Sequence, residues 1–181
     1  MVDVSEKPPT ARRAAAEALI TLSPETLSLV IDGGGPKGDV LSVAELAGVM
    51  GGKRTSELIP LCHPIALTDL VVTVTPDRVA GGLRIRAEAA TVGPTGVEME
   101  ALTAVSIAAL TVYDMVKGVE RGAEIRAVHL VSKSGGKSGE WERGGDGRSA
   151  ETRRPPERMA GRLPRIGRPA GRAGERRKGR S

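Results

Sequence analysis

The order of predicted elements along this chain indicates an α+β fold, a split βαβ sheet with helices packed on one side. Three observations support this prediction. Short β-branched or alternating runs at 70–74, 83–88 and 125–131 are typical of strands. An almost uncharged run at 101–116 is typical of a long helix, which is predicted over 98–117, and helix start signals precede two shorter helices upstream of it. The predicted order is therefore strand, helices, two strands, helix, strand.

The first predicted element lies within residues 12–22. This segment begins helix-like and ends as Ala-Leu-Ile-Thr-Leu, which suits a first strand. Ser23 then offers a capping side chain and Pro24 fits the first helical position, so a helix over 24–31 is predicted. The glycines at 33–35 end that helix.

A second helix is predicted from Ser42 to about Met50. Ser42 and Glu45 form a capping-box pattern, in which each side chain satisfies a free backbone N–H group of the first turn. Gly51 and Gly52 follow directly. Because glycine destabilises the interior of a helix, these two residues are predicted to interrupt it.

From residue 69 onward the pattern becomes that of a hairpin. The strand over 70–74 is followed by a turn over 76–82, and the strand over 83–88 alternates apolar with charged residues. One face of this hairpin is therefore predicted to be wet. The long helix over 98–117 comes next, and the strand over 125–131 completes the sheet.

Composition divides the chain into a folded domain over 1–140 and a basic Arg/Gly/Pro-rich tail over 141–181. The net charge of the 181 residues is +5, but the tail carries +8 and residues 1–140 carry −3. The basic balance thus belongs to the tail and not to a binding face of the domain. The tail has too few apolar residues to offset the entropy of ordering, so residues 143–181 are predicted to be disordered.

Several classes of protein are disfavoured by composition. Cys62 is the only cysteine, so no intramolecular disulfide can form and nothing indicates an oxidising compartment. The N-terminus has no apolar signal core, and no run approaches the roughly 20 apolar residues that span a bilayer. We therefore expect a cytoplasmic protein without membrane contact.

The main competing interpretation is an RNA-binding module with a basic tail. Recognition of single strands on a sheet relies on aromatic side chains that stack on the bases. Residues 1–140 contain one aromatic residue, Tyr113, inside the long predicted helix. A nucleic-acid partner is therefore not expected, although the tail alone could bind polyanions weakly.

A glycine-rich loop with two lysines directly follows the last predicted strand, Lys133-Ser134-Gly135-Gly136-Lys137-Ser138-Gly139. A P-loop would need glycine at position 131, where valine stands, and a helix after the loop, so a nucleotide triphosphatase is not predicted. Two interpretations stay open. The loop is either an anion site built from backbone N–H groups and lysines or a flexible solvated connection.

Two other pairs of side chains stand out by their chemistry. Cys62 and His63 are adjacent, so in an extended chain they face opposite ways and cannot form a nucleophilic dyad. Too few soft ligands accompany them for a zinc site, and Cys62 by itself is expected to be a small, buried hydrophobic residue.

Asp114 and Lys117 are either an ion pair or, if buried, a proton-transfer pair. We favour the reaction centre, because a carboxylate at the end of a helix opposes the dipole.

Several blocks of residues together resemble one family. They are Lys37-Gly38-Asp39, Lys53-Arg54-Thr55, Leu58-Ile59-Pro60-Leu61-Cys62-His63-Pro64, Gly96-Val97-Glu98-Met99-Glu100-Ala101-Leu102-Thr103, Tyr113-Asp114-Met115 and the loop at 133–139. In order and spacing these blocks are similar to the molybdenum cofactor biosynthesis protein C family, the cyclic pyranopterin monophosphate synthases. The resemblance runs from Met1 to about Glu140.

This resemblance implies an activity and an assembly. The activity is that of a lyase, which converts (8S)-3′,8-cyclo-7,8-dihydroguanosine 5′-triphosphate to cyclic pyranopterin monophosphate and pyrophosphate in molybdenum cofactor biosynthesis. The implied subunit is ferredoxin-like, in a homohexamer (a trimer of dimers) with active sites at the dimer interface. No resident cofactor or metal is expected, and whether Mg²⁺ accompanies the triphosphate stays open.

The resemblance also implies the roles of individual residues. Asp114 is then the general acid/base and Lys117 the catalytic lysine, with its pKa lowered by basic surroundings. The residues expected to bind the substrate are Cys62, His63, Glu98, Met99 and Glu100, together with Lys37, Lys53, Lys133 and Lys137 around the triphosphate and Arg12 and Asp3 on N-terminal motif positions. The resemblance gives these scattered cations one common role, because the pyrophosphate leaving group needs its charge stabilised in the transition state.

Overall fold

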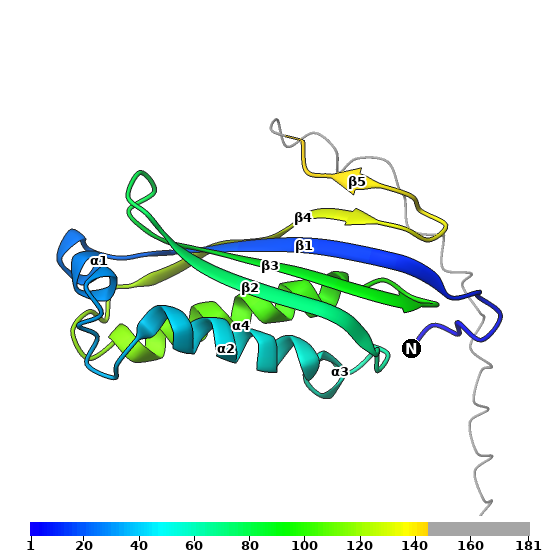
Figure 1. Cartoon of the computed structure of the whole chain (residues 1–181), viewed down its shortest axis with the longest axis horizontal. Coiled ribbons are helices and arrows are strands. Elements are labelled where there is room, and N and C mark those ends of the chain that lie inside the picture. Colours follow the sequence, from blue (N-terminus) through cyan, green and yellow to red (C-terminus); the bar gives the residue numbers. More distant parts are fainter. Residues whose placement is uncertain (145–181) are drawn as a thin grey trace, which may run out of the picture. The chain divides into compact units, whose positions relative to one another are not determined.

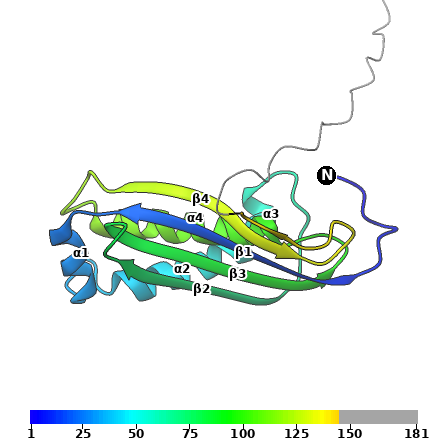
Figure 2. The same ribbon diagram turned by 90° about the horizontal axis from the view of Figure 1, so that it is seen from above.

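The computed structural model of the chain describes residues 1–144. In chain order its elements are β1 (Thr10–Thr21), α1 (Pro24–Ile31), α2 (Val40–Lys53), α3 (Thr55–Leu58), β2 (Leu67–Asp77), β3 (Gly82–Gly93), α4 (Glu98–Val116), β4 (Glu124–Ser134) and β5 (Trp141–Glu142). The strands form one antiparallel sheet in the order β2-β3-β1-β4-β5. Helices α2 and α4 cover one face of this sheet (Figures 1 and 2). The predicted α+β class, with an antiparallel sheet and helices on one face, is confirmed.

The central strand β1 is extended along its whole length, so the helix-like start predicted for residues 12–22 is wrong. Ala14, Ala16, Ala18 and Ile20 alternate along the strand and belong to the core beneath the helices. β1 pairs with β3 on one side and with β4 on the other. These two hydrogen-bonded ladders and the burial of one face outweigh the helix propensity of alanine.

Helix α2 continues through Gly51 and Gly52 to Lys53, so the predicted interruption is also wrong. A Cβ atom on Gly51 would lie 2.6 Å from Cγ1 of Ile107, and one on Gly52 would lie 3.1 Å from the carbonyl oxygen of Glu100. The glycines therefore let α2 approach α4 more closely than any side chain would allow. Their role is in packing between helices and not in ending one.

The predicted capping box at Ser42 and Glu45 does not form. Asp39 is the N-cap of α2, and its Oδ1 accepts a hydrogen bond from the backbone N–H of Ser42 at 3.1 Å. Oε1 of Glu45 instead accepts from the backbone N–H of Val74 at 2.9 Å. Because β2 is an edge strand, this bond helps to cover an open strand edge.

Helix α1 spans the residues that its local signals predict, and Oγ of Ser23 accepts the capping hydrogen bond from the N–H of Thr26 at 3.2 Å.

Helix α4 corrects the expectation that no segment approaches the length and apolar character of a membrane span, because it is long and apolar enough to cross a membrane by length and composition alone. Such a helix is weak evidence for a membrane span, since the core helix of a folded domain passes the same test. α4 packs against α2, β1, β3 and β4, and its Val105, Val112 and Val116 are fully buried.

The strands are longer than predicted, and two short elements were not predicted. β2 and β3 extend well beyond 70–74 and 83–88, and β4 extends beyond 125–131. Helix α3 and strand β5 add to the predicted set, and β5 pairs with the end of β4. Trp141 and Glu142, the first residues of the predicted tail, thus belong to the sheet, and its residues from 145 onward lie outside the described part of the chain.

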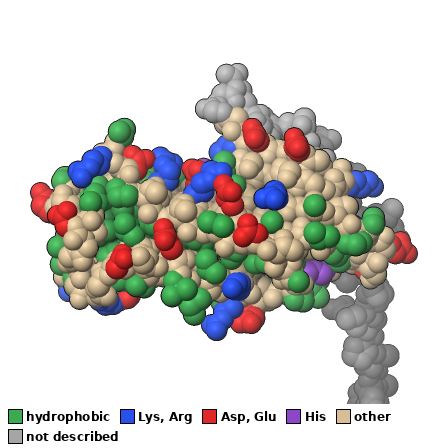
Figure 3. All heavy atoms as spheres, in the orientation of Figure 1, with side chains coloured by type: hydrophobic (Ala, Val, Ile, Leu, Met, Phe, Trp, Pro, Cys, Tyr) green, Lys and Arg blue, Asp and Glu red, His purple; other side chains and the backbone are tan. Residues whose placement is uncertain are grey.

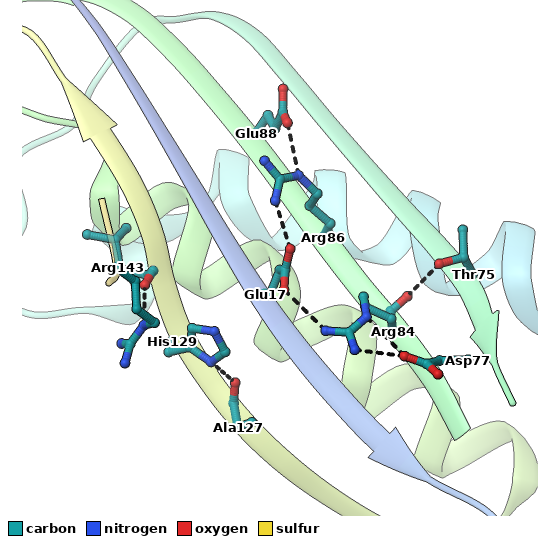
Figure 4. Close-up of polar contacts among 10 residues, drawn as sticks. Glu17, Thr75, Asp77, Arg84, Arg86, Glu88, Ala127, His129 and Arg143 are labelled. Carbon is teal, nitrogen blue, oxygen red and sulfur yellow. Dashed lines mark hydrogen bonds and ion pairs between the residues drawn. The ribbon is translucent and has the colours of Figure 1, made fainter. Parts of the chain in front are cut away.

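The face of the sheet away from the helices carries a network of ion pairs (Figure 4). Glu17 on β1 accepts hydrogen bonds from Arg84 at 3.3 Å and from Arg86 at 2.7 Å. Arg84 also pairs with Asp77, and Arg86 pairs with Glu88. The residues that alternate with these charges along β3, Leu83, Ile85 and Ala87, are buried on the helix side. The predicted wet face of the hairpin is confirmed.

Candidate active site

The predicted site residues gather at the two ends of α4. Glu98 and Glu100 lie in its first turn, Asp114 lies in its last turn, and Lys117 is its C-cap. At a rise of 1.5 Å per residue, the interval from Glu100 to Asp114 covers about 21 Å of helix axis. One copy of the chain therefore presents two separate groups of predicted residues.

A cavity of about 370 Å³ lies at the first turn of α4. Its walls include five of the predicted substrate-binding residues, namely Cys62, His63, Glu98, Met99 and Glu100. The first two come from the connection between α3 and β2, and the other three come from α4. We call this space the carboxyl cavity. It brings together side chains that lie more than thirty positions apart in the sequence.

Glu100 is the most unusual residue of the carboxyl cavity. It is only 3% exposed, and within the described residues its Oε2 has no hydrogen-bond partner. Burial raises the pKa of its carboxyl group, and the nearby charge of Glu98 adds to that effect. A buried carboxyl oxygen without a partner is costly in a folded protein. Its position in a cavity wall points to a ligand that completes its hydrogen bonding.

Cys62 is half-buried in the wall of the carboxyl cavity, so it is not the fully buried small hydrophobe that its residue type alone suggests. Burial raises the pKa of its thiol, and the charge of Glu100 raises it further. The thiol is therefore protonated near neutral pH. A protonated thiol is a poor nucleophile, so Cys62 can contact a ligand without attacking it.

A second cavity, of about 580 Å³, adjoins the first and is lined by the cations Lys7, Arg12 and Lys137 but by no carboxylate among the described residues. We call it the cationic cavity. The guanidinium group of Arg12 donates to the carbonyl oxygens of Gly93 at 3.1 Å and Pro94 at 3.2 Å, which fixes its position. A Cβ atom added at Gly136 would lie 2.0 Å from Nη1 of Arg12, so only glycine leaves room for the guanidinium group.

The loop at 133–139 reaches these cavities because its glycines adopt conformations that other residues avoid. Gly135 and Gly136 have φ of 90° and 72°. Nζ of Lys133 lies 3.5 Å from Oε1 of Glu98, which ties the loop to the first turn of α4. This contact places the loop beside the carboxyl cavity, and both interpretations of the segment, an anion site and a solvated connection, stay open.

Asp3 lines a shallower neighbouring cavity of about 610 Å³ together with His63. Its carboxylate accepts hydrogen bonds from the hydroxyl and the backbone N–H of Ser5, which hold the pKa of Asp3 below its usual value.

Lys53 lies outside these three cavities, exposed at the C-terminal end of α2. That end of α2 lies beside the first turn of α4, because Gly52 packs against the backbone of Glu100.

The other end of α4 carries a compact group of three charges. Oδ2 of Asp114 lies 2.5 Å from Nζ of Lys37, and its Oδ1 lies 2.6 Å from Nζ of Lys117. Hydrogen bonds from Lys117 and then from Lys37 lower the pKa of Asp114 to about 2. All three side chains are about half exposed, so in one copy of the chain this is an open surface group.

The expectation of a lowered pKa for Lys117 is wrong for a single copy of the chain. The hydrogen bond and the charge of Asp114 raise the pKa of Lys117 above its usual value. A carboxylate oxygen at 2.6 Å from its Nζ stabilises the ammonium form of Lys117. Asp114 is thus ionised and Lys117 is protonated near neutral pH.

Some residues of these cavities were not predicted from the sequence. Lys7 lines all three of the cavities described above, and Thr95 and Gly96 line both the carboxyl cavity and the cationic cavity. No pattern in the sequence singles out Lys7, which stands alone before two prolines. Within residues 1–144 no three His, Cys, Asp or Glu side chains are placed to hold a metal ion together.

Comparison with known proteins gives one consistent result. The MoaC family profile matches residues 1–136. A protein of Methylobacterium nodulans named cyclic pyranopterin monophosphate synthase is 59% identical over 142 residues, which is 78% of this chain and 89% of that protein. Proteins of the same name are 58% identical in Cereibacter sphaeroides, with the same coverage, and 55% identical in Brucella ovis, over 78% of this chain and 86% of the relative.

Proposed function

The chain belongs to the MoaC family, and we propose that it acts as a cyclic pyranopterin monophosphate synthase, a lyase of molybdenum cofactor biosynthesis. The proposed substrate is (8S)-3′,8-cyclo-7,8-dihydroguanosine 5′-triphosphate. The proposed products are cyclic pyranopterin monophosphate and pyrophosphate. The observation that carries the assignment is the match with relatives of this name over 78% of the chain, across both groups of charged residues.

The two adjoining cavities support a nucleotide as the substrate. The cationic cavity suits the triphosphate, because Arg12 and Lys137 offer N–H donors and positive charge without a competing carboxylate among its described walls. The carboxyl cavity suits the ring system, because apolar walls surround a few polar groups that can fix an orientation. Thr95 and Gly96 belong to both cavities, so one ligand can extend across them.

Asp114 and Lys117 are proposed to move the protons of the reaction. Ionised Asp114 accepts a proton, and Lys117 donates one, while the five-membered ring of the purine opens and the pterin ring forms. In the phosphoryl step a hydroxyl oxygen of the substrate bonds to the α-phosphorus. The bond from this phosphorus to its bridging oxygen breaks, and pyrophosphate leaves with the electron pair. Cations at the phosphates stabilise that leaving charge.

We propose that each complete site is built by two subunits. About 21 Å of helix axis separates Glu100 from Asp114 within one chain, too far for both to act at one reacting centre. A symmetric pair of chains can bring the start of one α4 beside the end of the other. The proposed assembly is a homohexamer, a trimer of dimers.

Exposed apolar side chains on α2 are consistent with such an assembly. Val43, Leu46 and Met50 are 42%, 62% and 50% exposed and follow one another on the surface of the helix. Figure 3 shows hydrophobic side chains reaching the surface over the helical layer. Apolar surface of this kind favours burial against another chain. The size of the assembly is measured directly by sedimentation equilibrium.

No resident cofactor is proposed, and the reaction is expected to run in the cytoplasm. The proposed steps are proton transfers and one phosphoryl transfer, which need no redox group. Activity is therefore expected to survive dialysis against EDTA. If Mg²⁺ accompanies the triphosphate, adding it back changes KM for the substrate and leaves the melting temperature of the free protein unchanged.

The decisive experiment supplies freshly prepared cyclic substrate to the purified chain. Pyrophosphate release and the fluorescence of the oxidised pterin are measured together. The relative from Methylobacterium nodulans serves as positive control, and Lys117→Ala serves as the inactive variant. Release of pyrophosphate by the wild type but not by Lys117→Ala is expected. A wild-type chain that releases none, while the relative does, would overturn the proposal.

A further inference from the structure

We propose that Thr91 is a positioning residue, which holds the connection between α3 and β2 so that Cys62 and His63 line the carboxyl cavity. Thr91 is not among the residues that line the three cavities described above, so it acts through the connection and not on a ligand. Its effect on turnover rests on the proposed function. The positioning itself does not, and it can be measured without substrate.

The connection between α3 and β2 has few fixed backbone groups. The N–H of Cys62 donates to the carbonyl oxygen of Ile59 at 3.0 Å, which holds the first part of the connection. Residues 63–66 belong to no helix or strand. Within residues 1–144, one hydrogen bond ties these four residues to the rest of the fold, from Oγ1 of Thr91 to the carbonyl oxygen of Ala66 at 2.7 Å. The loss of this bond therefore favours local opening.

Thr91 can hold this carbonyl group because it is itself firmly fixed. It is 2% exposed and lies on β3, on the same face of the strand as the core residues Ala87 and Ala89. β3 pairs with β1 on one side and with β2 on the other. Strands in the middle of a sheet open at a higher free energy than connections do. The donor thus has a fixed place, and the connection takes its place from it.

A β-bulge at the start of β2 explains why the connection needs a side-chain donor. Two steps along β2, from Leu67 to Asp69, oppose a single step along β3 from Thr91. A bulge bends its strand and interrupts the ladder of backbone hydrogen bonds. The chain before the bulge therefore leaves the sheet. The hydroxyl of Thr91 then satisfies the carbonyl oxygen of Ala66, which lies beyond the end of the ladder.

Thr91 also joins the two walls of the carboxyl cavity. One wall comes from the connection that carries His63, and the other comes from the first turn of α4. Residues 94–97 alone separate the end of β3 from that turn. The bond from Thr91 to Ala66 therefore fixes the first wall to the strand that leads directly into the second.

Cys62 reports on the connection, because it is the only cysteine of the chain and is half-buried in the cavity wall. Its rate of alkylation by iodoacetamide is measured on the full chain, without substrate and at one fixed pH. Thr91→Val keeps the shape of the side chain and removes the donor. This variant is expected to react about twofold to tenfold faster than the wild type, the change that corresponds to one hydrogen bond. Thr91→Ser keeps the hydroxyl and is expected to react at the wild-type rate.

Thr26→Val is the matched control. Thr26 is also buried, and its Oγ1 accepts a hydrogen bond from Oγ of Ser23 at 3.1 Å. It lies in α1, at the other end of the helical layer from α3 (Figure 1). This variant is expected to lose global stability in urea titration as Thr91→Val does, but to keep the wild-type alkylation rate. It thereby separates local opening of the connection from a general loss of stability.

Three results would each overturn the role of Thr91. They are equal alkylation rates of Thr91→Val and wild type, an equal rise in Thr26→Val, and a rise in Thr91→Ser as large as that in Thr91→Val. If Thr91→Val does not fold, Thr91→Ala gives the same comparison, because it also lacks the donor.

Turnover separates this role from the proposed function. If the wild type releases pyrophosphate, Thr91→Val is expected to raise KM more than it lowers kcat, because the connection lines the cavity while Asp114 and Lys117 lie at the other end of α4. Faster alkylation of Thr91→Val with no turnover by the wild type would leave the positioning in place and remove the proposed function. Turnover by the wild type with an unchanged KM in Thr91→Val would overturn the contribution of Thr91 to substrate binding and leave the proposed function in place.

Discussion

Two inactive variants of this chain are expected to restore each other's activity. Asp114→Asn removes the proposed proton acceptor at the end of α4, and His63→Ala removes a side chain that lines the carboxyl cavity at the start of α4. The separation of about 21 Å along α4 exceeds the reach of any side chain. If one reacting centre needs both residues, they have to come from different subunits.

The expected size of this recovery follows from counting sites. When the two variant chains pair at random, about half of the pairs are mixed, as for any symmetric dimer. In a mixed pair one site carries both defects, and the other site carries neither. One intact site in half of the pairs gives about a quarter of the wild-type activity.

The assay co-expresses the two variants with different affinity tags, so that their association can be verified, and the pyrophosphate release of the whole, unselected mixture is measured. The matched control combines Asp114→Asn with Lys117→Ala. Both of these residues lie at the same end of α4, so every site of a mixed pair keeps one defect and no recovery is expected. Equal activities of the two mixtures, whether both recover or both stay inactive, would refute the two-subunit site.

Three other predictions test the packing and the electrostatics. Gly51→Ala places a methyl group within 2.7 Å of Ile107 and should lower the free energy of unfolding by about 1–3 kcal/mol in urea titration. Glu100→Gln should stabilise the fold relative to the wild type, and the difference should grow as pH rises from 4 to 8. The reason is that ionisation of a carboxyl group whose pKa is raised by folding lowers the free energy of unfolding, by about 1.4 kcal/mol per unit of pKa elevation. Lys37→Met should raise the pKa of Asp114 from about 2 toward 3.8 without reaching it, since Lys117 stays in place, as measured by carboxyl carbon NMR.

Each of these predictions has a clear negative result. Wild-type stability of Gly51→Ala would mean that α2 and α4 separate at little cost. A pH-independent difference between Glu100→Gln and wild type would mean that the carboxyl group is not buried at equilibrium. Glu98→Gln is the matched control for that measurement, because Glu98 lies in the same turn of α4 but is partly exposed. An unchanged Asp114 titration in Lys37→Met would mean that Lys37 does not hold Asp114 in solution.

The elements that the sequence predicts well are those with local signals. α1 follows from the cap at Ser23 and from Pro24, and both act within one turn of the helix. The errors have tertiary causes. Gly51 looks like a helix breaker until Ile107 of another helix is seen to occupy the space beside it. The alanines of β1 look helical until two neighbouring strands supply their hydrogen bonds.

The candidate site follows the same division. Residue type and spacing single out the Asp114 and Lys117 pair, because two charges at i and i+3 in an apolar helix need a reason. Sequence spacing cannot show that Glu100 is buried without a partner among residues 1–144 or that Lys7 lines three cavities. Both facts depend on how distant segments meet around the start of α4.

The charges at the two ends of α4 differ in their relation to the helix dipole. Glu98 and Glu100 lie at the start of the helix, where the dipole favours carboxylates, whereas Asp114 lies near the end, where the dipole opposes one. Lys37 and Lys117 overcome that opposition, and the result is a carboxylate that stays ionised at any physiological pH. On the proposed function, the triphosphate of the substrate is expected to enter beside this group and to compete for the same lysines. Phosphate binding and proton uptake by Asp114 are therefore linked, because each anion lowers the share of lysine charge available to the other. On the proposed function, Asp114 is therefore expected to be a stronger base once the substrate is bound.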